Sequence, residues 1–170
     1  MLRVLLIALA LSLNGCERSA PPTSDETGIR VDQRMGATPD PGFARALTVR
    51  PFDFPTDHGP HPDYATEWWY FTGNLRDAEG RRFGYQLTLF RVGLRPGEPA
   101  ADSRWRAHQV YMGHLAISDI DASTHHRAER FSRAAAGLAG ASADPLHVWL
   151  GPWSIRGSEH ALFPLRLSAH

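Results

Sequence analysis

The sequence predicts an all-β domain in which antiparallel strands form a sandwich or a barrel. Hydrophobic residues alternate with polar ones along several stretches, which is the period of a strand rather than of a helix. Turn-forming residues separate these stretches at hairpin spacing. The 170 residues are 42% hydrophobic and carry 18 basic against 18 acidic side chains. This composition is typical of one soluble domain and differs from the clustered basic face of a nucleic-acid-binding protein.

The N-terminus has the pattern of an export signal over residues 1–15. The apolar run over residues 4–13 is too short to span a bilayer as a helix, and Cys16 follows soon after it. This context is similar to a bacterial lipobox, so we predict a lipidated Cys16 that anchors the exported protein to a bacterial membrane, on the periplasmic side. The alternatives are a non-lipidated start and a free thiol in an unprocessed tail. Because Cys16 is the only cysteine, no intramolecular disulfide forms.

A change in composition separates this start from the folded part of the chain. Between Cys16 and Gly42 the sequence is rich in proline, serine, threonine and aspartate, and all 17 aromatic residues lie from Phe43 onward. Segments without aromatic residues bury too little apolar surface to fold alone. We therefore predict a flexible tether over residues 16–46 and a folded domain over residues 47–170.

Two strands joined by a turn open the predicted domain. Residues 67–75 and 82–92 are rich in aromatic and β-branched residues, and the Asp77–Gly80 segment between them has turn residues. On the second strand, alternation puts one set of side chains on the more apolar face: Phe83, Tyr85, Leu87 and Leu89. On the first strand, Glu67, Trp69 and Phe71 must face opposite to Trp68 and Tyr70. One of these two sets is expected to face the core.

Further strands are predicted over residues 107–119, 125–131, 147–154 and 162–169. Residues 95–103 read as a loop, and residues 137–141 read as a helical turn whose glycines weaken it. His125 and His126 are expected in an exposed turn. The last alternating segment stops at His170 without a cap or tail, which indicates an incomplete barrel or a truncated chain.

The segment from Phe52 to Tyr70 holds the candidate site. Its prolines stiffen a loop that leads into an aromatic strand, which suits polar groups at the mouth of an apolar pocket. We predict catalytic roles for Glu67, His58 and Asp57. Burial beside two tryptophans would favour a neutral, proton-donating Glu67. The alternatives are a salt bridge from Glu67 to Arg82 or Arg91, and a turn-forming role for Asp57.

The remaining candidates are ligand contacts. His61 and four rings are expected to line the pocket, with pure core packing as the alternative for any ring: Trp68, Trp69, Tyr70 and Tyr85. His58 and His61 could instead hold a metal, but their spacing is weak and the surrounding prolines exclude a regular helix. No metal site and no cofactor is predicted. The sequence has no serine-nucleophile elbow, phosphate loop or dinucleotide fingerprint.

Several runs of this sequence resemble the carotenoid 1,2-hydratase family, also called the hydroxyneurosporene synthase or AttH-type lipocalin-like family and often labelled secreted hydrolase. The runs are Phe54–Tyr64, Glu67–Gly73, Phe83–Arg91, Tyr111–Asp119 and Glu129–Arg133. The resemblance covers residue 52 to the end of the chain, and its first motif is long enough to be specific.

The resemblance implies a lipocalin-like, calycin-type barrel, the first of two packed together, that takes an apolar polyene or lipid-like ligand. Carotenoid hydratases add water across a terminal double bond without a cofactor: an acid protonates the alkene, and water captures the tertiary cation. In that family the catalytic acid lies in the second barrel, beyond the residues present here. Three interpretations follow: a lipid-anchored relative of the hydratases, a non-catalytic carrier associated with an ABC-type exporter, and a secreted hydrolase.

Overall fold

The computed structural model describes residues 40–97, 105–158 and 162–170. The predicted signal segment, Cys16, residues 16–39 of the predicted tether and most of the 95–103 loop lie outside the described residues. None of the helices in the described part is long and apolar enough to cross a membrane.

Two antiparallel four-stranded sheets make up the described fold, with strand orders β1-β2-β3-β4 and β5-β6-β7-β8. The elements are η1 (Thr56–His58), β1 (Thr66–Arg76), β2 (Arg82–Gly93), β3 (Gln109–Asp119), β4 (Thr124–Arg133), β5 (Ala139–Ser142), β6 (His147–Leu150), β7 (Trp153–Arg156) and β8 (Arg166–Ser168). Only η1, one 3-10 turn, is helical among the described residues. The all-β antiparallel class is confirmed, and the arrangement is consistent with a lipocalin-like barrel.

The cross-strand register sorts the first sheet into an inner and an outer face. Trp69 pairs with Leu89 and Phe71 pairs with Leu87, so these side chains share one face. This inner face is the one covered by the second sheet, and it carries the predicted set Phe83, Tyr85, Leu87 and Leu89. Trp68 and Tyr70 point to the outer face, where 61% and 50% of their surfaces are exposed.

The core lies between the two sheets. Leu87, Leu89 and Tyr111 of the first sheet pack with buried residues of the second, among them Trp153. A side chain at Gly113 would meet the Trp153 ring at 2.8 Å, so glycine allows the sheets to approach closely there. Trp153 is 1% exposed, and its indole N–H donates to the carbonyl of His170 at 2.7 Å.

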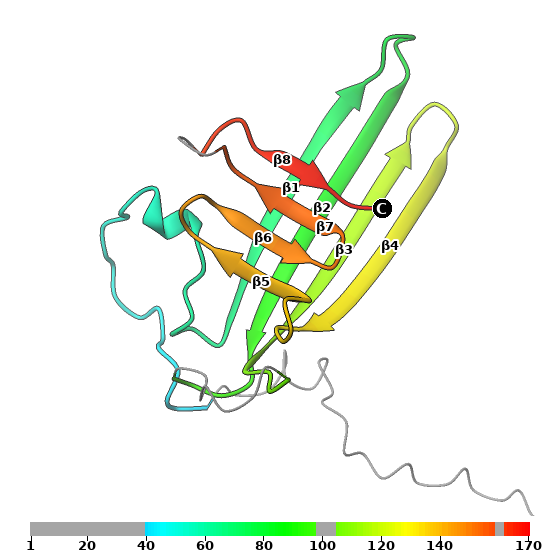
Figure 1. Cartoon of the computed structure of the whole chain (residues 1–170). Helices are drawn as coiled ribbons and strands as arrows, with labels where there is room; N and C mark the ends of the chain where they lie inside the picture. Colours follow the sequence, from blue (N-terminus) through cyan, green and yellow to red (C-terminus); the bar gives the residue numbers. More distant parts are fainter. Residues whose placement is uncertain (1–39, 98–104, 159–161) are drawn as a thin grey trace, which may run out of the picture. The chain divides into compact units, whose positions relative to one another are not determined.

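The second sheet is shorter than the first and crosses only part of its inner face. Figure 1 shows the turn ends of the β1–β2 and β3–β4 hairpins extending beyond β8. Leu75 and Ile117 lie on the inner face near these ends, and they are 55% and 37% exposed. The apolar face predicted from alternation therefore continues past the area that the second sheet covers.

The second sheet corrects three sequence predictions. Residues 137–141 form no helical turn, because Gly137 takes φ +75° and leads into β5. The predicted strand over 147–154 is a hairpin of two short strands, because Gly151 at φ +56° reverses the chain. The predicted strand over 162–169 is confined to β8.

The first sheet corrects one further sequence prediction, the position of the turn before β4. His125 and His126 are exposed, as predicted, but they lie on β4 and not in a turn. The turn comes earlier, at residues 120–123, where Ser123 has φ +54°. The side chain of Asp119 accepts a hydrogen bond from the backbone N–H of Ala122 at 2.9 Å, which favours a turn at this point of the chain.

Candidate functional site

The loop before β1 is fixed at two places. Gly59 closes η1 by donating its N–H to Thr56 at 2.9 Å, and any side chain at Gly59 would collide with Ala143 between β5 and β6. The indole N–H of Trp69 donates to the carbonyl of His58 at 3.0 Å. The prolines and these contacts hold the loop against both sheets, so its polar side chains have defined positions.

His61 lies at the centre of this loop, between two carboxylates. Its Nδ1 is 3.1 Å from Glu67 and its Nε2 is 3.1 Å from Asp57. The backbone N–H of His61 also donates to both Glu67 oxygens, at 3.0 and 2.8 Å. The His61 ring therefore has a carboxylate at each of its two nitrogens. His61 thus joins two acids that are ten residues apart in the chain.

An arginine completes each end of this arrangement. Arg50 makes a bidentate pair with Asp57, at 2.8 and 2.7 Å. This guanidinium, the backbone N–H of Asp53 and the His61 ring hold the pKa of Asp57 well below its usual range. Arg91 donates from Nε to Glu67 at 2.5 Å. We call the five side chains Arg50, Asp57, His61, Glu67 and Arg91 the ionic chain.

Arg91 is the buried end of the ionic chain. It is 1% exposed, and its Nη2 donates to the carbonyls of His61 and Tyr64, both at 2.7 Å. A buried guanidinium that binds a carboxylate and two loop carbonyls ties the loop to β2. The salt bridge offered as an alternative for Glu67 is present with Arg91, whereas Arg82 pairs with Asp121 instead.

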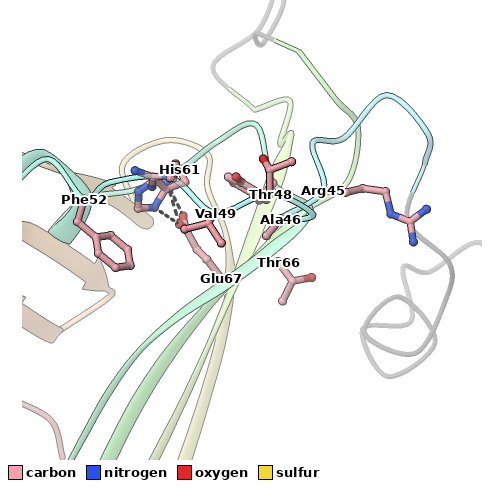
Figure 2. Close-up of a pocket in the computed structure, with 10 residues that line it drawn as sticks. Arg45, Ala46, Thr48, Val49, Phe52, His61, Thr66 and Glu67 are labelled. Carbon is pink, nitrogen blue, oxygen red and sulfur yellow. Dashed lines mark hydrogen bonds and ion pairs between the residues drawn. The ribbon is translucent and has the colours of Figure 1, made fainter.

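A cavity of about 450 Å³ lies beside the ionic chain. Figure 2 shows His61 and Glu67 pointing toward one another, with Val49 and Phe52 drawn beside them. The lining residues are Arg45, Ala46, Thr48, Val49, Arg50, Phe52, His61, Tyr64, Thr66 and Glu67. The cavity thus combines apolar side chains with three members of the ionic chain, Arg50, His61 and Glu67. Both carboxylates of the network are held by arginines, so the network can orient a polar group beside the cavity.

The structure brings together only some of the predicted site residues. Asp57, His61 and Glu67 form one cluster, whereas the ring of His58 stacks on Phe54 at 4.3 Å. Trp69 is on the inner face and half-buried, while Trp68 and Tyr70 face outward and cannot line the same pocket. Tyr85 is six residues along β2 from Arg91, or about 20 Å. The predicted ligand wall is therefore divided among three places. The catalytic roles of Glu67, His58 and Asp57 remain predictions.

Tyr85 lies in a second hollow, at the uncovered end of the inner face. This hollow has a volume of about 290 Å³ and is lined by Leu75, Tyr85, Leu87, Leu115, Ile117, Leu167 and Ala169. We call it the apolar groove. No charged side chain lines it. Its walls come from β1, β2 and β3 on one side and from β8 and the residue after it on the other.

Sequence reasoning missed Arg50 as a site residue and missed most of the apolar groove. The groove had a detectable signal, because alternation puts Leu75 and Ile117 on the apolar face of their strands. No sequence signal identified Arg50, because no local pattern relates this residue to Asp57. The part of the chain that the structure describes contains no group of three or more histidine, cysteine, aspartate or glutamate side chains arranged to hold a metal ion.

Comparison with known proteins places these features in a family. The AttH-like family model matches residues 45–170. Among solved structures, an AttH candidate from Nitrosomonas europaea is similar at 26% sequence identity, with a TM-score of 0.61 over 75% of this chain. The match spans 38% of the length of that protein. A search of curated proteins finds no match. Since the family model covers most of the chain, this protein belongs to the AttH-like family.

Proposed function

We propose that this chain binds an apolar polyene or lipid-like molecule in the apolar groove and acts as a carrier rather than as an enzyme by itself. The observation that supports this best is the groove, an uncharged hollow that continues the core and remains open to solvent. Its volume of about 290 Å³ is near the lower end of small-molecule sites, about 300–1,000 Å³. Apolar hollows of this kind favour ligands without charge.

Hydration, the finer activity that the family resemblance suggests, needs an acid that protonates an alkene. Asp57 and Glu67 are each paired with an arginine, and the Arg50 guanidinium holds the pKa of Asp57 well below its usual range. The groove itself contains no carboxyl group. We therefore propose that hydration requires residues beyond this chain, which covers 38% of the related structure. The polar cavity beside Glu67 and His61 would then orient a polar end of the ligand or a water molecule.

Substitutions in the groove test the binding proposal. Leu75→Asp and Ile117→Asp each introduce a carboxylate on the inner face, so we expect the dissociation constant for an uncharged fluorescent polyene, the methyl ester of parinaric acid, to rise at least about tenfold. Both positions are partly exposed, so the fold should tolerate the change. Ile120→Asp is the matched control, because Ile120 is 46% exposed and lies outside the groove. Equal affinities in all four proteins, or no binding in any, would contradict the carrier proposal.

The carrier is proposed to work at a membrane, through an acylated Cys16. Two or three acyl chains at about 0.8 kcal/mol per buried methylene would hold it there stably. We expect Cys16→Ser to release the protein from the detergent phase of a phase-separation assay. Intact-mass measurement provides the independent check. An unmodified mass in the wild type, with unchanged partitioning in the variant, would rule out the anchor.

A further inference from the structure

The segment over residues 45–54, which we call the apolar loop, is exposed although it is rich in large apolar side chains. It lies between the bridge of Ala44 to Tyr64 and η1, and it has no strand or helix of its own. Four of its residues are strongly exposed: Leu47 at 78%, Val49 at 104%, Phe52 at 72% and Phe54 at 58%. Single exposed apolar residues are ordinary, but several on one short loop mark an interaction site.

The loop is ordered by stacked groups. The Arg50 guanidinium lies 5.6 Å from the centroid of the Phe52 ring. Phe52 and Phe54 stack at 5.6 Å, and Phe54 stacks on His58 at 4.3 Å. The same Arg50 binds Asp57 in the ionic chain. Exposed rings that are already held in place lose little conformational freedom when they are buried against a partner.

The loop carries guanidinium groups among its apolar side chains. Arg45 and Arg50 are both exposed, and Arg50 pairs with Asp57, so Asp53 and Asp57 balance the two arginines. Apolar rings and side chains flanked by arginines are typical of segments that lie at a lipid surface, with the rings at the level of the headgroups.

The position of the loop in the chain points to the same partner. Cys16 precedes Arg45 by 29 residues, whose fully extended length is at most about 100 Å. An anchor at Cys16 would therefore keep the loop close to a bilayer and raise its effective concentration there. We infer that the apolar loop docks onto a bilayer surface, as a second membrane contact besides the acylated cysteine. This inference rests on the proposed membrane location.

The test uses the chain from residue 16 onward with Cys16→Ser, so that neither the signal segment nor acyl chains contribute to binding. Vesicles of phosphatidylethanolamine and phosphatidylglycerol are sedimented with the protein. We expect Leu47→Ser/Phe52→Ser to lower the partition coefficient at least about tenfold. The matched control is Trp68→Ser/Tyr70→Ser, which removes two exposed rings from the outer face of β1 and should change it less than about twofold. Both pairs are exposed, and circular dichroism verifies that each variant is folded.

A second measurement reports from the loop itself. The Cys16→Ser chain has no other cysteine, so Val49→Cys accepts a single polarity-sensitive fluorophore. We expect a blue shift on adding the vesicles, and no shift for a label at Leu138→Cys. Equal partitioning of the loop variant and its parent, or an unshifted label at position 49, would overturn the inference. So would self-association of the parent that needs no vesicles and is lost in the loop variant. Because these measurements need no acylation, failure of the loop and failure of the Cys16 anchor are distinguishable.

Discussion

Arg91→Met is expected to lower the free energy of unfolding by about 3–5 kcal/mol, the range for removing one partner of a buried ion pair. Methionine fills much of the same volume, but it leaves the Glu67 carboxylate without its guanidinium and leaves the carbonyls of His61 and Tyr64 without a donor. The midpoint of urea unfolding measures this loss. The loop before β1 should also become accessible to proteases, because Arg91 ties it to β2.

Two further variants separate charge from packing at this position. Glu67→Gln keeps the volume of the side chain but leaves Arg91, which is 1% exposed, without a counter-charge, so it should also destabilise strongly. Combining it with Arg91→Met should recover part of the loss, because replacing both partners avoids a lone buried charge. An unchanged stability of Glu67→Gln would argue against a structural role for this carboxylate.

Arg82→Met is the matched control for this set. Arg82 pairs with Asp121 at 2.9 Å, but the side chains are 56% and 39% exposed. Exposed pairs of this kind contribute about 0–1 kcal/mol. If Arg91→Met unfolded at the same urea concentration as Arg82→Met, the ionic chain would not be the element that holds the loop.

Trp153→Ala is expected to cost about 3–5 kcal/mol, as large-to-small substitutions of buried aromatic residues do. Trp153 fills the space between the sheets above Gly113 and is 1% exposed. Its loss leaves a cavity where the two sheets meet at Gly113. Thermal unfolding followed by circular dichroism should show a clear fall in the midpoint. The midpoint of Trp153→Phe should lie between those of the wild type and Trp153→Ala. Phenylalanine still supplies an aromatic ring to the core, but it lacks the indole N–H that binds the carbonyl of His170.

Trp68→Ala provides the comparison for this variant. Trp68 is 61% exposed on the outer face, and surface substitutions usually change stability by less than about 0.5 kcal/mol. If Trp153→Ala and Trp68→Ala had the same midpoint of thermal unfolding, the second sheet would not depend on Trp153 for its packing. Loss of groove binding in Trp153→Ala without loss of stability would instead indicate a role for this ring in shaping the ligand site.

Strand positions and strand faces were predictable from sequence because alternation is a local property. β1 and β2 begin and end within one residue of their predicted bounds, and Glu67 shares a face with Trp69 and Phe71 as expected. The same local signal failed where chain direction changes over a few residues. Gly137 and Gly151 adopt positive φ, and alternation carries no information about such reversals.

The candidate site was only partly predictable, because its contacts join segments that alternation does not relate. The loop motif pointed to Asp57, His61 and Glu67, and alternatives for Glu67 included Arg91. That Arg50 reaches Asp57 depends on a loop without regular structure, and that Arg91 is buried depends on the pairing of β1 with β2. The apolar groove depends on the lengths of the two sheets. Its residues alternate as core residues do, and they line an open hollow because the second sheet, whose edge strand is β8, covers only part of the inner face. Periodicity along a strand defines which side chains face inward, but only sheet-on-sheet packing decides which of them another layer covers.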